Sequence, residues 1–160
     1  MISLLDKIKK KRCKVLIIGL GYVGWPLFCT IRNKGLDVSG LDTNKDLILK
    51  NKNYKNNLFF LYEDINFSEI DVVIIALPTP LKNNKPDLSY LNETMKLILY
   101  KLKKNTLIVL ESTSYPSTTE EVISSKVKKR FKIGKDFFIG YSPEREDPGN
   151  KRYNLKNIQK

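Results

Sequence analysis

The chain has 160 residues, of which 41% are apolar; this is enough for one well-buried domain and too few to expect two. It contains no histidine, which excludes a Ser-His-Asp triad, a Cys-His pair and a histidine-bound zinc. The formal net charge of +12 comes mainly from lysines spread along the chain. Arginines interleaved with aromatic residues, as on base-stacking surfaces, are missing, so we expect no nucleic-acid partner.

Location and the two cysteines can also be predicted from the sequence. No run of eighteen apolar residues occurs, and the first residues turn basic where a secretory signal would become apolar. We therefore expect a cytoplasmic protein with no membrane partner. The spacing of Cys13 and Cys29 predicts neither a metal site nor a redox pair, and we interpret both as structural.

Expected strands and helices alternate along the chain after a basic lead at residues 1–12. The expected strands are residues 15–18, 36–41, 58–62, 71–77, 106–110 and 137–141. The expected helices are residues 24–34, 44–50 and 88–102, the last capped by Asp87, and one from Thr118 or Thr119, as its cap, to about Arg130. This order predicts one α/β domain over residues 13–160, with a Rossmann-like, doubly wound, mostly parallel sheet and helices on both faces.

The segment GLGYVG lies between the first expected strand and the first expected helix. There Gly19 allows a tight turn, Gly21 lets a pyrophosphate approach the backbone, and Gly24 lets helix and strand pack closely. Asp42 follows the second strand, where a carboxylate accepts hydrogen bonds from ribose hydroxyls and repels a 2′-phosphate. The pattern predicts a dinucleotide site that prefers NAD to NADP. The alternative is three turn glycines and a helix-capping aspartate.

Hydroxyl side chains follow two later strands. Thr79 lies in the segment PTP, beside Pro78, and Ser112 and Thr113 lie in ESTSYP. In a doubly wound sheet the ends of these strands face the ligand, so we expect the hydroxyls to face the cofactor or the reacting carbon. In the alternative interpretation these side chains only close their own turns.

The last expected strand is followed by SPEREDPGN, which places four charged residues together. A carboxylate near a reacting centre can act as a general base on water, and an arginine can bind a phosphate or a carboxylate. The alternative is a solvated turn. These four residues are Glu144, Arg145, Glu146 and Asp147.

Taken together, the segments GLGYVGWPL, DVVIIALPTPL, PDLSYL, ESTSYPSTTEE and GYSPEREDPGN, with Asp42, resemble the UDP-glucose/GDP-mannose dehydrogenase family. The resemblance runs from about Lys14 to the end. The amino-acid sequence of these segments is most similar to that of the bacterial branch that acts on UDP-N-acetylglucosamine in capsule and O-antigen synthesis. Such enzymes oxidise the sugar C6 alcohol to a carboxylate with two NAD⁺, through an aldehyde and a cysteine-bound thioester, and the cofactor carries the hydride chemistry.

The resemblance also implies roles for individual residues. Thr113 would help to orient the catalytic water, and Glu144 would assist proton movement during thioester hydrolysis. Arg145, Glu146 and Asp147 would line the UDP-sugar side, and no metal is implied. The residues implied to contact NAD are Gly19, Gly21, Tyr22, Val23, Gly24, Asp42, Pro78, Thr79 and Thr113.

Three positions depart from the family pattern. Trp25 stands where a leucine is usual, Ser117 where a glycine is usual, and Leu47 where a lysine often follows the ribose-binding acid, a role that Lys45 would have to take. The family's catalytic cysteine lies in a later glycine-, cysteine- and proline-rich motif that these 160 residues lack. We therefore expect them to bind NAD without turning over a nucleotide sugar.

Two alternatives stay open at this point. One is a non-catalytic remnant that folds without binding NAD, because Trp25 or the lack of later elements collapses the site. The other is a Rossmann dehydrogenase of the hydroxyacid or phosphogluconate type, which would share the glycines and the acid but lack ESTSYP and SPERED. Full-length members of the resembled family are expected to be homo-oligomers.

Overall fold

Six parallel strands form the central sheet of the computed structural model, which describes residues 3–143. The strands are β1 (Lys14–Ile18), β2 (Asp37–Leu41), β3 (Leu58–Phe59), β4 (Val72–Ile75), β7 (Thr106–Leu110) and β8 (Phe137–Tyr141). Their order in the sheet is β3-β2-β1-β4-β7-β8. This is the Rossmann order, so the prediction of a doubly wound α/β sheet is confirmed, and the order reverses between β1 and β4.

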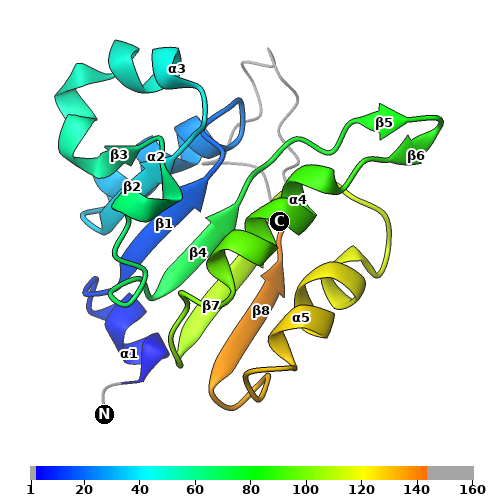
Figure 1. Cartoon of the computed structure of the whole chain (residues 1–160). Coiled ribbons are helices and arrows are strands. Elements are labelled where there is room, and N and C mark those ends of the chain that lie inside the picture. The colour runs from blue at the N-terminus through cyan, green and yellow to red at the C-terminus, as the bar shows by residue number, and fades with distance from the viewer. Residues whose placement is uncertain (1–2, 144–160) are drawn as a thin grey trace, which may run out of the picture.

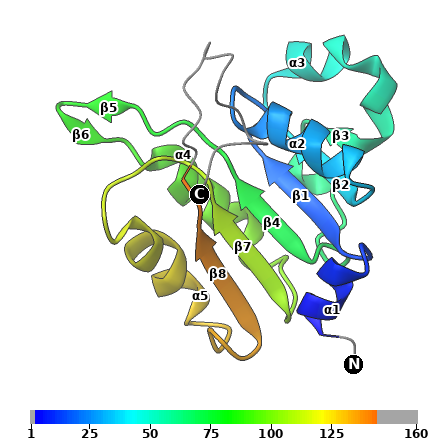
Figure 2. The ribbon, with the colours of Figure 1, turned by 180° about the vertical axis from the view of Figure 1, so that it is seen from behind.

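Helices cover both faces of the sheet. They are α1 (Leu4–Lys9), α2 (Gly24–Asn33), α3 (Lys45–Lys50), α4 (Ser89–Ile98), the π-helical turn η3 (Thr119–Ser124) and α5 (Ser125–Val127). In Figure 1, α4 lies in front of the sheet, whereas α2 lies behind it and is seen over β1 and β2 in Figure 2. No helix within residues 3–143 is long and apolar enough to cross a membrane.

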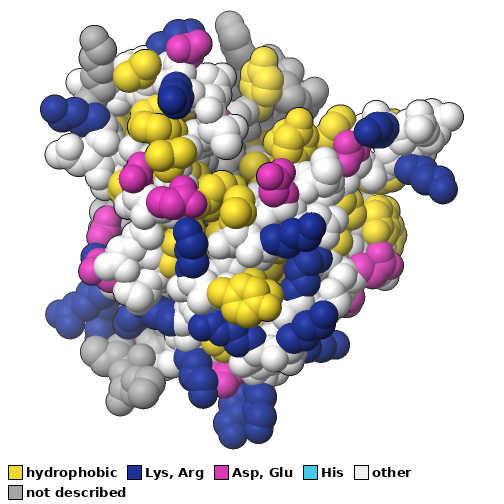
Figure 3. Space-filling view, viewed as in Figure 1, with side chains coloured by type: hydrophobic (Ala, Val, Ile, Leu, Met, Phe, Trp, Pro, Cys, Tyr) yellow, Lys and Arg dark blue, Asp and Glu magenta, His cyan; other side chains and the backbone are white. Residues whose placement is uncertain are grey.

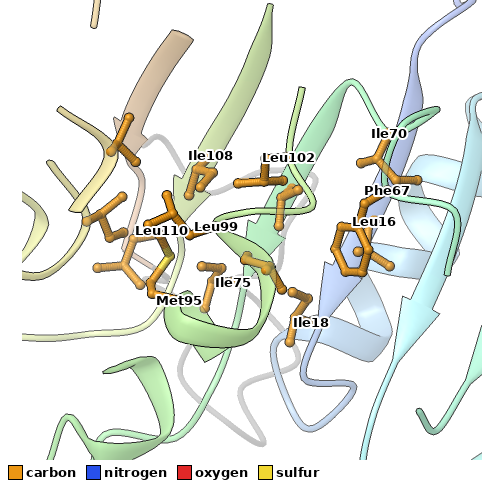
Figure 4. Packing of buried hydrophobic residues seen from close by; sticks show 14 of the residues in the cluster. Leu16, Ile18, Phe67, Ile70, Ile75, Met95, Leu99, Leu102, Ile108 and Leu110 are labelled. Carbon is orange, nitrogen blue, oxygen red and sulfur yellow. The ribbon is translucent and has the colours of Figure 1, made fainter. Parts of the chain in front are cut away.

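The alternation of side chains along each strand divides the core into two layers. Leu16, Ile18 and Ile75 point to the layer shared with α4, where Met95 and Ile98 are fully buried (Figure 4). Their neighbours in the strands point to the other layer, against Phe28 of α2. Strands that are buried on both faces explain the continuous apolar runs in the sequence.

Several expected element boundaries are wrong. The strand expected at residues 58–62 stops at Phe59, and Tyr62–Asp64 forms a 3₁₀ turn, η2. A second 3₁₀ segment, η1 (Lys52–Asn57), precedes β3. The strand expected at residues 71–77 covers only Val72–Ile75, and the helix expected at 88–102 covers Ser89–Ile98. Tertiary packing decides such ends, because local propensity changes little over one or two residues.

Both predicted helix caps are tested by hydrogen bonds. The Asp87 carboxylate accepts the backbone N–H of Ser89 at 2.9 Å, but the N-cap of α4 is Leu88, which makes no side-chain cap bond, so the expectation that Asp87 caps the helix is wrong by one residue. The Thr118 hydroxyl instead donates to the Tyr115 carbonyl at 2.8 Å and makes no cap bond, so that expectation is wrong. The segment that follows begins as a π-helical turn and ends as three α-helical residues, well short of Arg130.

Two features were not expected from the sequence. Residues of the basic lead form α1, which begins at an N-cap in which the Ser3 hydroxyl accepts the Asp6 N–H. A β-hairpin made of β5 (Leu81–Lys82) and β6 (Lys85–Pro86) projects from the body of the domain (Figure 1). Its two turn residues, Asn83 and Asn84, both have positive φ, as in hairpin turns of the primed types.

At the amino end of the sheet, Asp71 directly precedes β4 and is 3% exposed. Its carboxylate pairs with Lys7 of α1 at 2.7 Å and with Lys103 at 3.0 Å, and it accepts the backbone N–H of Lys14 at 3.1 Å. Burial alone would raise the pKa of Asp71, but these hydrogen bonds lower it below its usual value. The buried charge therefore fastens α1 and the residues after α4 to the same edge of the sheet.

Candidate active site

The glycine loop joins β1 to α2 at the point where the strand order reverses. Gly19 has φ +90°, and a Cβ added there would lie 2.5 Å from the Ala76 carbonyl oxygen. A Cβ on Gly24 would lie 1.8 Å from the Gly19 carbonyl oxygen, so only glycine lets α2 start so close to β1. A Cβ on Gly21 would meet no atom within 4 Å. Two glycines thus serve the fold, and the third borders open space.

The amino terminus of α2 faces this open space. The first N–H groups of a helix have no intrahelical partner and carry a partial positive charge. The first turn of α2 contains no acidic side chain, as is also true of α4, whereas α1, α3 and η3 each carry at least one. No carboxylate of the first turn therefore competes for this end of α2, and a bound phosphate would be stabilised there.

Asp42 follows β2 and binds the glycine loop. One of its carboxylate oxygens accepts the Leu20 N–H at 2.7 Å, and the other accepts the Asn44 N–H at 2.8 Å. No ion pair within residues 3–143 involves Asp42. Each oxygen keeps a lone pair for a further donor. This geometry suits a carboxylate that receives two ribose hydroxyls.

The loops after β4 and β7 lie together, as expected from the order of the sheet. The Thr79 hydroxyl donates to the Thr113 carbonyl at 2.5 Å, which links the two loops directly. Ser112 is buried, and its hydroxyl lies 3.5 Å from the Ile75 carbonyl oxygen. Thr79 therefore links two loops and does not close its own turn, and both threonines also border the cleft described next.

One cleft of about 580 Å³ connects these features. Of the residues predicted to contact NAD, all except Gly24 line it, and Gly24 is buried beneath Gly19. Among the other lining residues, the sequence had drawn attention to Ser112 and Leu47. The rest were missed, although several lie inside the recognised segments, because a segment does not show which of its side chains face the cleft. They are Ile18, Leu41, Thr43, Asn44, Tyr62, Ala76, Leu77, Tyr90 and Glu111.

Tyr62 is the most informative of the missed residues. It lies in η2, and its hydroxyl shares a hydrogen bond of 2.9 Å with the Thr94 hydroxyl of α4. Burial raises the pKa of Tyr62, and the negative charges of Glu93 and Asp42 raise it further, so the phenol stays neutral. The sequence predicted Tyr62 as the last residue of the strand at residues 58–62, whereas it lies in a short 3₁₀ turn, and no local pattern relates it to α4.

The departures from the family pattern have structural explanations. Trp25 stacks on Phe28 at 5.3 Å and meets Tyr54 edge-on at 5.8 Å, outside the cleft. It packs against the core layer beneath α2 rather than filling the cofactor site. Trp25 thus gives no support to the remnant alternative, which required it to collapse that site.

At position 47 the chain has a leucine where the family often has a lysine. Leu47 lines the cleft, whereas the Lys45 ammonium lies over the ring of Phe60 at 4.9 Å and is not among the lining residues. Lys45 therefore does not take the place of the missing lysine. The cleft wall next to Asp42 is apolar at this position.

Ser117 adopts φ +75°, a conformation that favours glycine, so the family's usual glycine has a backbone reason. Both cysteines are free: Cys13 is buried and Cys29 is half-buried. Burial raises the pKa of each thiol, which is the opposite of what a nucleophilic cysteine needs. Glu144, Arg145, Glu146 and Asp147 lie outside the described residues.

The described residues fit NAD. The space beside Gly21 suits the pyrophosphate at a helix amino terminus, and the Asp42 carboxylate suits the adenosine ribose. Where bound, NAD supplies a hydride acceptor, and the chain's own groups bind and orient it. The cleft lies outside the carboxyl ends of β1 and β4, as expected at the switch point of a doubly wound sheet.

Comparisons with known proteins agree with this geometry. The profile of the UDP-glucose/GDP-mannose dehydrogenase family, NAD binding domain, matches residues 46–160. Protein CapL of Staphylococcus aureus is 38% identical over 91% of this chain, and the UDP-N-acetyl-D-glucosamine 6-dehydrogenase of Salmonella typhi is 37% identical over 92%. The chain spans 38% of the length of each of these relatives.

A solved structure is similar in fold. The UDP-D-ManNAc dehydrogenase of Pyrococcus horikoshii superposes with a TM-score of 0.75 and 28% identity. The match covers 85% of this chain and 37% of that chain. The similarity thus covers most of this chain and a little over a third of the longer one.

Proposed function

Because the chain belongs to the UDP-glucose/GDP-mannose dehydrogenase family, as its NAD-binding domain, we propose that it supplies the cofactor half of a UDP-sugar 6-dehydrogenase. The observation that carries the proposal is the pair of sites at the switch point. Gly21 leaves open space at the start of α2, and Asp42 presents a carboxylate that forms no ion pair among the described residues 3–143. A dinucleotide needs both.

The order of the cofactor along the cleft follows from these contacts. The pyrophosphate binds at Gly21, Tyr22 and Val23, and the adenosine ribose binds at Asp42. The nicotinamide half then extends toward Pro78, Thr79 and Thr113 at the ends of β4 and β7. Gly19 and Gly24 act by letting the loop take its shape.

The proposed chemistry divides between this domain and the family's cysteine-bearing portion. Thr113, on the exposed loop after β7, orients the water that hydrolyses the thioester, and Glu144 moves its proton. Arg145, Glu146 and Asp147 contact the UDP-sugar. A polypeptide of these 160 residues binds NAD and does not oxidise a sugar nucleotide, since the family's cysteine motif is not in this sequence.

The first experiment is a calorimetric titration of the 160-residue chain with NAD and with NADP. We expect NAD to bind and NADP to bind at least tenfold more weakly, because its 2′-phosphate would meet the Asp42 carboxylate. Asp42→Ala should weaken NAD binding by roughly ten- to a hundredfold, which corresponds to losing one or two charged hydrogen bonds. Glu69→Ala, on the opposite edge, is the control and should bind like the wild type.

A folded chain that shows no response to millimolar NAD or NADH would contradict the proposal. Equal affinity for NAD and NADP would contradict the role of Asp42 while leaving dinucleotide binding intact. Circular dichroism of each variant separates a lost contact from a lost fold.

The substrate is proposed as UDP-N-acetylglucosamine, the substrate named for the Salmonella typhi relative. A chimera that joins residues 1–160 to the rest of that enzyme should reduce two NAD⁺ per sugar oxidised. In the chimera, Thr113→Ala and Glu144→Gln should each lower the turnover number strongly and change the KM for NAD by a smaller factor. Faster turnover of UDP-N-acetylmannosamine or UDP-glucose would assign a different sugar, and an unchanged turnover number in both variants would remove their proposed roles.

A further inference from the structure

The cleft that Asp42 borders is also lined by apolar and aromatic side chains. Leu47 of α3, Leu77 after β4, Tyr62 of η2 and Tyr90 of α4 all line it. They come from four separate elements. If the pyrophosphate lies at Gly21 and the ribose at Asp42, as the proposed function requires, the remaining part of the adenosine must lie against side chains next to Asp42.

Tyr62 is next to Asp42 and is held in place. The Asp42 N–H donates to the Phe59 carbonyl at 3.1 Å, Tyr62 follows Phe59 by three residues, and Asp42 and Tyr62 line the same cleft. The Tyr62 hydroxyl bonds to Thr94, which is 3% exposed and one helical turn after Tyr90. Thr94 therefore fixes the direction of the Tyr62 ring, and Tyr90 lies on the same face of α4.

These contacts select a flat, weakly polar ring as the occupant. A purine has π faces that stack on aromatic side chains, and small-molecule binding sites are lined mostly by apolar and aromatic residues. From this we infer that Tyr62, positioned by Thr94, forms the adenine-binding wall of the cleft together with Leu47, Leu77 and Tyr90. The inference rests on the proposed binding of NAD and names the residue that recognises its base.

The roles of the two hydroxyl-bearing residues differ. Tyr62 touches the base, whereas Thr94 acts through Tyr62 and is a positioning residue. Leu47 is relevant because a lysine at that position would bring a charge to the wall, where Lys45 does not reach. A neutral wall favours the uncharged base over a second phosphate.

The test uses the 160-residue chain, with AMP and NAD as probes in calorimetric titrations. We expect Tyr62→Ala to weaken both ligands by about tenfold or more, the usual loss when a base loses its stacking partner. The loss should be equal for AMP and NAD, because both carry the same adenosine. Tyr100→Ala is the matched control, since Tyr100 is 78% exposed in the turn after α4 and lies outside the cleft.

Two further variants test the positioning role and guard against a variant that does not fold. Tyr62→Phe and Thr94→Val each remove the shared hydrogen bond and keep the remaining shape. We expect each to weaken AMP by a few-fold, and the double variant to be no weaker than either single variant. An NMR contact between the adenine H2 or H8 proton and the ring protons of residue 62 should appear in wild type and in Tyr62→Phe.

The outcomes separate the two claims. Wild-type chain that binds NAD and AMP, with Tyr62→Ala unchanged or with no adenine contact to residue 62, would overturn the inference and leave the proposed function standing. Additive losses in the double variant would overturn the role of Thr94. A folded wild-type chain that binds neither ligand would overturn both the inference and the proposed function.

Discussion

Two aspartates lie at opposite ends of the parallel strands, Asp71 at the amino ends and Asp42 at the carboxyl ends, and their carboxylates have different partners. Asp71 directly precedes β4 and is 3% exposed, paired with the ammonium groups of Lys7 and Lys103. Asp42 directly follows β2, and its bonds are to two backbone N–H groups, from Leu20 and Asn44. The first carboxylate is neutralised within the fold, and the second keeps capacity for a ligand.

The surface follows the same division. In Figure 3, lysine and arginine side chains gather over the lower part of the face, toward the amino ends of the strands, and hydrophobic side chains appear above them. Parallel strands place all their carboxyl ends at one edge, so binding groups collect there while the other edge is free for structural contacts. Changes at the amino edge should therefore alter stability, and changes at the carboxyl edge should alter NAD binding.

The largest expected effect is on stability and comes from the glycine loop, although this loop lies at the carboxyl ends of the strands. Gly24→Ala should destabilise the domain by about 3 kcal/mol or more, because the new methyl group would lie 1.8 Å from the Gly19 carbonyl oxygen. Thermal unfolding should show a melting temperature lower by roughly 10 °C. Gly21→Ala is the matched variant: its methyl group meets no protein atom within 4 Å, so stability should hold while NAD affinity falls at least about tenfold. Equal stability of the two variants would contradict the close packing at Gly24.

Removing the buried carboxylate should show the reverse pattern. Asp71→Ala should lower the free energy of unfolding by about 2–3 kcal/mol, because three hydrogen bonds to a buried charge are lost. Its NAD affinity should equal that of the wild type. Urea unfolding and calorimetry measure the two quantities. Glu69→Ala, which removes an exposed ion pair with Lys14, should leave both unchanged. Weakened NAD binding in a folded Asp71 variant would show that the two edges are coupled.

Acid should act on stability through Asp71. Its pKa is lower in the folded chain than the usual 3.8, so the unfolded chain binds the proton more readily. The stabilisation is therefore fully present above about pH 4 and is lost as the pH falls through the lowered pKa. Urea unfolding between pH 2 and pH 6 should show a steeper loss of stability in the wild type than in Asp71→Asn. Parallel curves would contradict this source of acid sensitivity.

The smallest expected effect is a gain in stability. Ser117 has φ +75°, a backbone conformation that is strained for any residue with a Cβ atom and relaxed for glycine. Ser117→Gly should stabilise the domain by about 1 kcal/mol and raise the melting temperature by roughly 3 °C. Gly35→Ala is the converse control, since Gly35 has φ +80° with open space around it, and should destabilise by a similar amount. A lower melting temperature for Ser117→Gly would mean that flexibility gained in the unfolded chain outweighs the relieved strain.

Much of this molecule follows from local sequence signals. The continuous apolar runs of β1, β4 and β7, and the glycines placed between β1 and α2, determine a doubly wound sheet with a dinucleotide loop. Gly19, Gly24 and Asp42 have the structural settings that their spacing predicted. These signals are readable because each comes from neighbouring residues in one element.

Contacts between distant segments could only come from the tertiary structure. Tyr62 and Thr94 are 32 positions apart, and Lys7 and Asp71 are 64 apart, so no local pattern relates either pair. Packing decided that Trp25 joins the core beneath α2 and that Leu47, rather than Lys45, lines the cleft. The sequence by itself determined the fold and the positions of the glycine loop and Asp42, whereas the tertiary structure decided which other side chains line the cleft, because burial and charge pairing depend on the whole fold.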